Sequence, residues 1–159
     1  MKKLHVEEGT WFREATAEEV VAAARAVLAS RVRKGTALTS PRIASDYLAA
    51  RFGERAHEVF SVLFLDARSR LIDCVELFRG TIDGASVHPR EVVKEALQRN
   101  AAAVILCHNH PSGVAEPSHA DEMITARLRD ALALVDVRLV DHLIVAGPTV
   151  VSLAELGRL

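Results

Sequence analysis

The sequence predicts an α/β fold, and three observations support this class. The chain has 159 residues, a length typical of one compact domain. Half of the residues are hydrophobic and 26% are charged, which is ordinary for a globular protein and excludes a mostly disordered chain. Apolar runs with the character of β-strands alternate with segments of helical pattern, and this alternation favours a sheet covered by helices.

Residues 1–36 are expected to form a helical N-terminal extension. Thr16 and Glu19 have the spacing of a capping box, in which two side chains satisfy free backbone N–H groups at a helix start. The alanine- and valine-rich stretch behind them predicts a helix to about Ser30, and Gly35 marks its end.

Residues 37–159 are expected to form the domain itself. Ser40 and Pro41 supply a helix cap and a first-turn proline, and runs of β-branched and aromatic residues indicate strands. The first two strands are separated by only five residues and are expected to pair as a hairpin. In order, we expect a helix over 40–53, strands over 58–65 and 71–78, a loop over 80–84, a helix over 89–100, a strand over 103–107, a helix over 118–135 and strands over 137–145 and 149–153.

Composition and charge exclude several classes of function. The chain has 20 basic and 21 acidic residues, so its net charge is −1 and direct nucleic-acid binding is not expected. No apolar run reaches the length of about 18 residues that a membrane span needs, and the acidic residues near the N-terminus do not fit a signal peptide. Cys74 and Cys107 are too few for a disulfide framework. We therefore expect a cytoplasmic protein without a membrane association.

The stretch from His108 to Asp121 carries the candidate chemistry. If the preceding strand continues to His110, the two histidines point to the same side with Cα atoms about 6.6 Å apart, and their imidazoles can converge on one ion. Catalytic zinc takes three protein ligands and keeps a fourth position for water, and two histidines with one carboxylate are a standard set. Asp121 is the natural third ligand, because the intervening loop can fold back and present the start of the next helix.

Several of these residues have simpler interpretations. Ser118 and Asp121 also have the spacing of a capping box, and we expect the capping and metal-binding roles to coexist only if Asp121 turns away from the helix end. His142 is interpreted as a structural residue, with support of a metal ligand as the alternative. Cys107 is interpreted as a small buried strand residue.

The spacing of these motifs resembles that of a known family. The pattern His-x-His-Pro, six residues, Ser, two residues, Asp is similar to the JAMM motif of JAB/MPN-domain metalloproteases, and it is formed here by His108, His110, Pro111, Ser118 and Asp121. Three strings are similar to the RadC-like branch of that family: His-Asn-His-Pro-Ser-Gly at 108–113, Leu-Phe-Arg-Gly-Thr at 77–81 and His-Pro-Arg-Glu at 88–91. The resemblance covers residues 37–159.

The resemblance implies a fold and a metal site. The fold would be JAB/MPN-like, similar to cytidine deaminases, with a mixed β-sheet flanked by helices. The site would be a zinc ion held by His108, His110 and Asp121, with Ser118 donating a hydrogen bond to the developing oxyanion.

The resemblance also implies a glutamate that acts as general acid and base. In the family this glutamate lies where the first helix of the domain leads into the first core strand, which here points to Glu58. Glu76, on the second predicted strand, is the competing candidate. Asn109 lies between the two histidines, where deubiquitinating members usually have Ser or Thr, and this departure argues against a ubiquitin-like substrate. The N-terminal region lacks the helix-hairpin-helix segment of longer RadC-like proteins, so the chain resembles a short form.

The expected function is therefore a zinc-dependent JAMM-type hydrolase of peptide or isopeptide bonds, acting on a protein or peptide substrate. One alternative is a non-catalytic accessory factor in DNA repair or recombination, a process with which RadC-like proteins are associated. A second alternative is metal-dependent cleavage of phosphodiester bonds.

Overall fold

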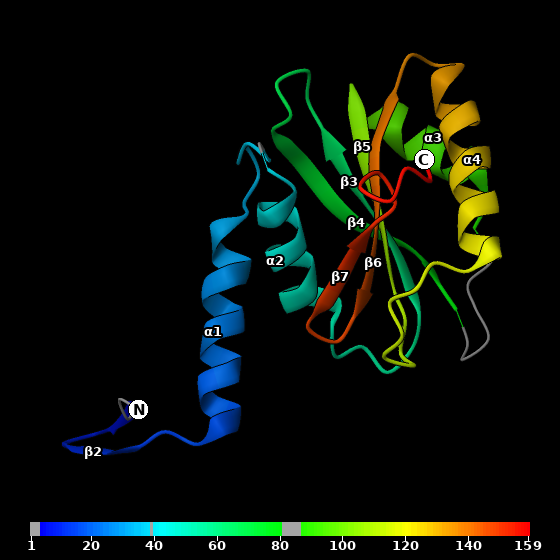
Figure 1. The fold of residues 1–159 in the computed structure, drawn as a ribbon. Helices are drawn as coiled ribbons and strands as arrows, with labels where there is room; N and C mark the ends of the chain where they lie inside the picture. The colour runs from blue at the N-terminus through cyan, green and yellow to red at the C-terminus, as the bar shows by residue number, and fades with distance from the viewer. Residues whose placement is uncertain (1–3, 39, 81–86) are drawn as a thin grey trace.

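The computed structural model describes residues 4–38, 40–80 and 87–159 (Figure 1). Most of the predicted loop over 80–84, and Thr81 of the 77–81 motif, lie outside these residues. The helices and strands are, in chain order, β1 (His5–Glu8), β2 (Trp11–Glu14), α1 (Ala17–Arg31), α2 (Pro41–Phe52), β3 (Val59–Leu65), β4 (Leu71–Arg79), α3 (Pro89–Gln98), β5 (Ala103–Asn109), α4 (His119–Ala133), β6 (Arg138–Ala146) and β7 (Thr149–Ser152).

The core of the molecule is a mixed five-stranded sheet with the order β4-β3-β5-β6-β7. Strands β5 and β6 pair in parallel, whereas β3–β4, β3–β5 and β6–β7 are antiparallel. The predicted hairpin of β3 and β4 is confirmed. Figure 1 shows α2 on one side of this sheet and α3 and α4 on the other. The predicted α/β class and the mixed sheet flanked by helices are thus confirmed.

The central strands are apolar on both faces because helices cover both faces. In β3, Phe60 and Phe64 pack with the residues of α3 and α4, whereas Val59 and Leu63 pack with those of α2. Every residue of β3 and of β5 is buried. Full burial of a large aliphatic or aromatic side chain contributes about 1.5–3 kcal/mol, so these two strands are the stable support on which the site is built.

The N-terminal extension differs from the predicted helical one. Residues 5–14 form an antiparallel hairpin in which His5 pairs with Glu14 and Glu8 with Trp11. Gly9 begins the turn with φ of +64°, a conformation that glycine adopts without strain. The expectation of a helical extension therefore does not hold for residues 5–14, where β-prone residues flank a glycine turn, although the helix expected from Thr16 to about Ser30 is present as α1. The predicted capping box at the start of α1 is present.

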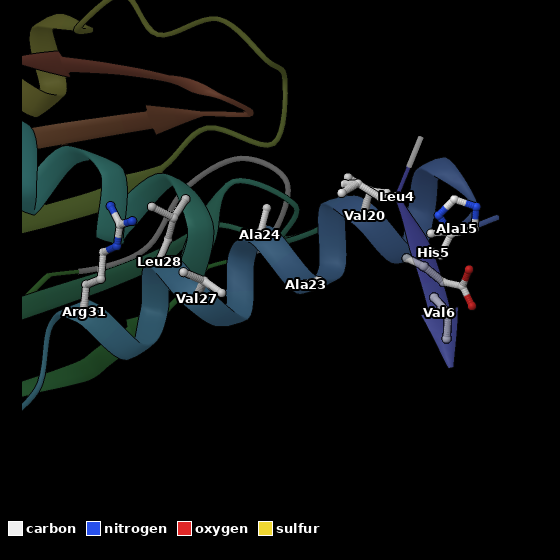
Figure 2. A pocket seen from close by; sticks show the side chains of 11 residues that line it. Leu4, His5, Val6, Ala15, Val20, Ala23, Ala24, Val27, Leu28 and Arg31 are labelled. Atoms are coloured by element: carbon white, nitrogen blue, oxygen red, sulfur yellow. The ribbon is translucent and has the colours of Figure 1, made fainter. Parts of the chain in front are cut away.

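The extension is attached to the domain through the packing of α1 on α2. A groove of about 530 Å³ runs between β1 and α1 and is lined mostly by alanine, valine and leucine. Figure 2 shows Leu4, which immediately precedes β1, beside Val20 at the start of α1, with Val27 and Leu28 further along the helix. Within the described ranges, none of the helices combines the length and the hydropathy that crossing a bilayer requires.

Candidate metal centre

Strand β5 delivers the two predicted histidine ligands. His108 is the penultimate residue of β5, and the N–H of His110 donates to the carbonyl of Val145 at 2.8 Å, which continues the pairing with β6 beyond the strand end. The two side chains therefore point to the same side of the sheet, as predicted. Their Nε2 atoms lie 2.9 Å apart.

Helix α4 brings Asp121 to the same place. Its Oδ1 lies 3.0 Å from Nε2 of His108, and its Oδ2 lies 3.5 Å from Nε2 of His110. One potential ligand atom from each of the three residues falls within 4.8 Å of the others. Two imidazole nitrogens and a carboxylate oxygen are a donor set that fits zinc. The three residues form a group that can hold a metal ion.

Asp121 caps its helix and faces the histidines at the same time. The N–H of Ser118 donates to Oδ2 of Asp121 at 2.8 Å, and the N–H of Asp121 donates to Oγ of Ser118 at 3.2 Å. The second carboxylate oxygen, Oδ1, remains directed at His108. Contrary to the expectation, Asp121 therefore does not have to turn away from the helix end, because Oδ1 faces His108 while Oδ2 caps the helix and still lies near His110.

Ser118 is oriented by the same carboxylate. Its hydroxyl donates to Oδ2 of Asp121 at 2.6 Å, and a hydroxyl has only one hydrogen to donate. In this arrangement Ser118 holds Asp121. The hydroxyl would have to rotate away from Asp121 in order to donate to an oxyanion.

A hydrogen-bond chain behind His108 sets the tautomer of its imidazole. The hydroxyl of Thr125 donates to the carbonyl of Asp121 at 2.5 Å, so it accepts the hydrogen of His142 Nδ1 at 2.6 Å. Burial lowers the pKa of His142 far below its usual value, so this imidazole is neutral and its Nε2 is an acceptor. Nε2 of His142 lies 2.8 Å from Nδ1 of His108, which must donate to it. When His108 is neutral, the lone pair of its Nε2 therefore faces Asp121.

His110 is oriented in the same way by the loop that follows it. Its Nδ1 lies 2.7 Å from the carbonyl oxygen of Val114, which can only accept, so Nδ1 carries a hydrogen. When His110 is neutral, its Nε2 has the free lone pair. Both imidazoles thus present Nε2 to the centre, with the other nitrogen held by a hydrogen bond, as is usual for histidines that bind metals.

The electrostatics of the group suit a cation. Burial raises the pKa of Asp121, but hydrogen bonds from His108 and His110 outweigh it and hold this pKa well below its usual range. The hydrogen bond to Asp121 raises the pKa of His110 against the opposing effect of burial, and the nearby charge of Glu58 contributes in the same direction. The carboxylate is therefore ionised, and its negative charge favours a positive charge beside it, on a protonated imidazole or on a bound cation.

The two candidate glutamates lie in different surroundings. Glu58 immediately precedes β3, two residues before Phe60, and Phe60 stacks on His108 with ring centroids 6.2 Å apart. The alternation of side chains along an extended segment directs residues 58 and 60 to the same side of the sheet. Glu76 instead pairs with Arg55 at 2.9 Å, and its register partner in β3 is Ser61. Strand alternation thus directs Glu58 to the side of the sheet that carries the three predicted ligands, and Glu76 to the other side.

For His142 the sequence interpretation preferred a structural role and kept support of a metal ligand as the alternative; the contact of its buried side chain with His108 favours the alternative. Thr125 is the residue that the sequence interpretation missed. Thr125 lies one helical turn after Asp121, so the sequence already places its hydroxyl near the carbonyl of that residue. The prediction that Cys107 is a buried strand residue is confirmed.

A mixed sheet flanked by helices, with two histidines at the end of a central strand and an aspartate in the first turn of the next helix, is the arrangement of a JAB/MPN-like domain. The chain belongs to the RadC-like JAB domain family, whose model matches residues 38–158.

Similar proteins from three organisms support this assignment. A UPF0758 protein of Thioalkalivibrio sulfidiphilus is 60% identical over 142 residues, covering 89% of this chain and 63% of that protein. A UPF0758 protein of Nitrosococcus oceani is 61% identical over 132 residues, with coverages of 83% and 59%. One from Stutzerimonas stutzeri is 57% identical over 140 residues, with coverages of 88% and 62%. The chain thus spans less than two thirds of the length of these relatives.

Proposed function

We propose that this protein is a zinc-dependent hydrolase of peptide or isopeptide bonds. One observation carries the proposal: independent hydrogen bonds orient both imidazoles so that Nε2 of each faces the ionised carboxylate of Asp121. Such a pre-oriented set of neutral nitrogen donors and an anionic oxygen donor is typical of zinc sites.

His108, His110 and Asp121 would hold the ion. When bound, zinc would supply a Lewis acid that polarises a carbonyl oxygen and lowers the pKa of a water molecule to about 7. The side chains of His110 and Asp121 are 18% and 14% exposed, whereas that of His108 is 2% exposed. The group is thus buried behind His108 and open on the side of the other two ligands, where a substrate can approach.

Glu58 is the residue that we assign to proton transfer. Hydrolysis of an amide adds water to the carbonyl carbon, breaks the C–N bond and leaves a proton to be moved from water to nitrogen. A carboxylate beside the ligands can accept this proton and deliver it to the departing amine. The position of Glu58, immediately before β3 and on the same side of the sheet as His108, supports this role.

Metal content tests the site. Wild type, His108→Ala and Asp121→Ala are purified in zinc-containing buffer, desalted and analysed for metal, with His119→Ala as the control because His119 is an exposed neighbour outside the group. We expect stoichiometric zinc in wild type and in the control, and little in the two ligand variants. Equal zinc in all four proteins would overturn the proposal.

The assigned chemistry is tested with substrates. Zinc-loaded protein is incubated with peptide and isopeptide-linked libraries and, separately, with single- and double-stranded DNA. Cleavage of amide bonds that falls by a factor of about 10²–10⁴ in Glu58→Gln, with zinc content unchanged, supports the assignment. If zinc-loaded protein cleaves DNA but no amide bond, the substrate bond is a phosphodiester and not an amide.

A further inference from the structure

Asn109 occupies an unusual place between the two histidines. As the last residue of β5 it points to the opposite side of the sheet from His108 and His110, and it is only 2% exposed. Its Oδ1 accepts the N–H of Val59 at 2.8 Å. Its Nδ2 donates to the carbonyl of His57 at 3.1 Å and lies 3.4 Å from that of Arg55.

These hydrogen bonds extend the contact between β5 and β3 beyond the point where the backbone pairing of the two strands ends. The antiparallel pairing of β3 with β5 ends at Phe60 and His108, and the N–H of His110 bonds to β6 instead. Val59 is buried, and without Asn109 its N–H would have no partner in β5. The side chain of Asn109 therefore takes over the hydrogen bonds that main-chain atoms would make. It connects the strand that carries the ligands to the segment that leads into β3.

The residue held in the middle of this connection is Glu58. Asn109 binds the backbone of His57 on one side and of Val59 on the other, and the carbonyl of Glu58 accepts the N–H of Gly80 at 2.9 Å. The peptide groups on both sides of the Glu58 Cα are thus bonded. This bonding sets the direction in which the Glu58 side chain leaves the backbone.

We propose that Asn109 is a positioning residue that holds Glu58 against the metal centre. The inference rests on the proposed function, because it assumes that Glu58 acts on the group bound at His108, His110 and Asp121. The two ligands that flank Asn109 in sequence and the glutamate 51 positions earlier then belong to one rigid unit. A displacement of about 1 Å in a reacting group can lower a rate about 100-fold, so such a unit has a direct consequence for catalysis.

The amide of Asn109 suits these three partners chemically. It must accept one hydrogen bond and donate to two carbonyl oxygens, and a primary amide has both capacities. An aspartate would place a carboxylate against two carbonyl oxygens. A serine hydroxyl is shorter and has one hydrogen, so it cannot serve Val59, His57 and Arg55 together.

Cobalt(II) is the probe for the test, because its visible absorption and the pH dependence of that absorption report the groups around the ion. The variants are Asn109→Ala, Asn109→Ser, Glu58→Gln and the double variant Glu58→Gln/Asn109→Ala, with His119→Ala as the control. Hydrogen exchange of the Val59 amide is measured in parallel. The serine variant keeps a polar group at the buried site and serves if the alanine variant does not fold.

We expect all variants to bind cobalt within about threefold of wild type, because the three ligands are unchanged. Glu58→Gln should lower the midpoint of the spectral pH profile by about one unit, since it removes a negative charge beside the ion. Asn109→Ala and Asn109→Ser should lower it in the same direction, and the double variant should match Glu58→Gln. Exchange of the Val59 amide should accelerate about tenfold in both Asn109 variants, because a hydrogen bond is lost.

Two results separate the inference from the proposed function. If Glu58→Gln shifts the profile while both Asn109 variants keep the wild-type profile, Asn109 does not position Glu58 and the inference is overturned, while the role of Glu58 stands. If Glu58→Gln leaves the profile unchanged, Glu58 does not face the ion, and both the proposed proton transfer and the inference fail.

Discussion

The N-terminal extension exposes large apolar side chains, whereas the sheet domain buries polar ones. In the extension, Trp11 and Phe12 are 78% and 71% exposed, whereas in the domain the polar side chains of His108, Asn109 and His142 are almost completely buried. Buried polar groups are tolerated only when they are hydrogen-bonded, and each of these three is. The comparison teaches that the packing energy is concentrated in the domain, where it holds the site rigid.

The largest expected difference between the domain and the extension is in the free energy of unfolding. Leu63→Ala removes a fully buried side chain from β3 and should lower the free energy of unfolding by about 2–5 kcal/mol. Trp11→Ala, although the larger side chain is deleted, should change it by less than about 0.5 kcal/mol. Urea denaturation of both variants measures the difference. Similar losses in the two variants would show that the extension is part of the core.

The next effect concerns the support behind the ligands. His142→Ala leaves the Nδ1 hydrogen of His108 buried without an acceptor and frees the imidazole to change its tautomer. Zinc affinity should fall about 10–100-fold, as is typical when a hydrogen-bond partner of a metal ligand is removed. Competition with a chromophoric chelator measures the affinity. His5→Ala in the extension is the matched control, and an equal loss in both variants would contradict the assigned role.

The reactivity of the two thiols distinguishes a fully buried cysteine of the domain from a partly buried one. Burial raises the pKa of Cys107 well above its ordinary value, and burial also raises the pKa of Cys74. Since the thiolate is the reactive form, both thiols should react slowly in the folded protein, and Cys107 the more slowly because it is fully buried. Labelling with a disulfide reagent, with and without denaturant, checks this order. Immediate labelling of Cys107 in the native protein would contradict the packing of β5.

The smallest effect is confined to the extension and depends on pH. The hydrogen bond from Arg13, followed by that from the backbone of Thr16, lowers the pKa of Glu19 from 4.5 to about 2. Because the folded-state pKa is lower than the unfolded one, the stabilisation of α1 is present above about pH 4.5 and is lost as the pH falls towards 2. Hydrogen exchange in the first turn of α1 should accelerate over this range. Glu19→Gln should remove the dependence, while unfolding of the sheet should be unaffected by the variant.

Much of the domain and of its ligand set was predictable because the signals are local. Dense apolar runs predicted the strands of the sheet, and the spacing from His108 to Asp121 predicted the group of two histidines and one aspartate that can hold a metal ion. The hairpin at 5–14 was missed because its strands have four residues each, too few for a clear pattern. The choice between Glu58 and Glu76 stayed open because both lie on or next to strands, and only strand register directs one of them to the ligands.

By itself, the sequence determined the order of helices and strands in the sheet domain, the pair of histidines on one side of a strand and the carboxylate at the start of the following helix. These features depend on residues close together in the chain, where backbone periodicity decides which way side chains point. Tertiary structure alone decided that His142 supports His108, 34 residues away, and that Asn109 bonds on both sides of Glu58. Such contacts depend on which strands lie side by side and in which register, and the packing of the whole core determines both.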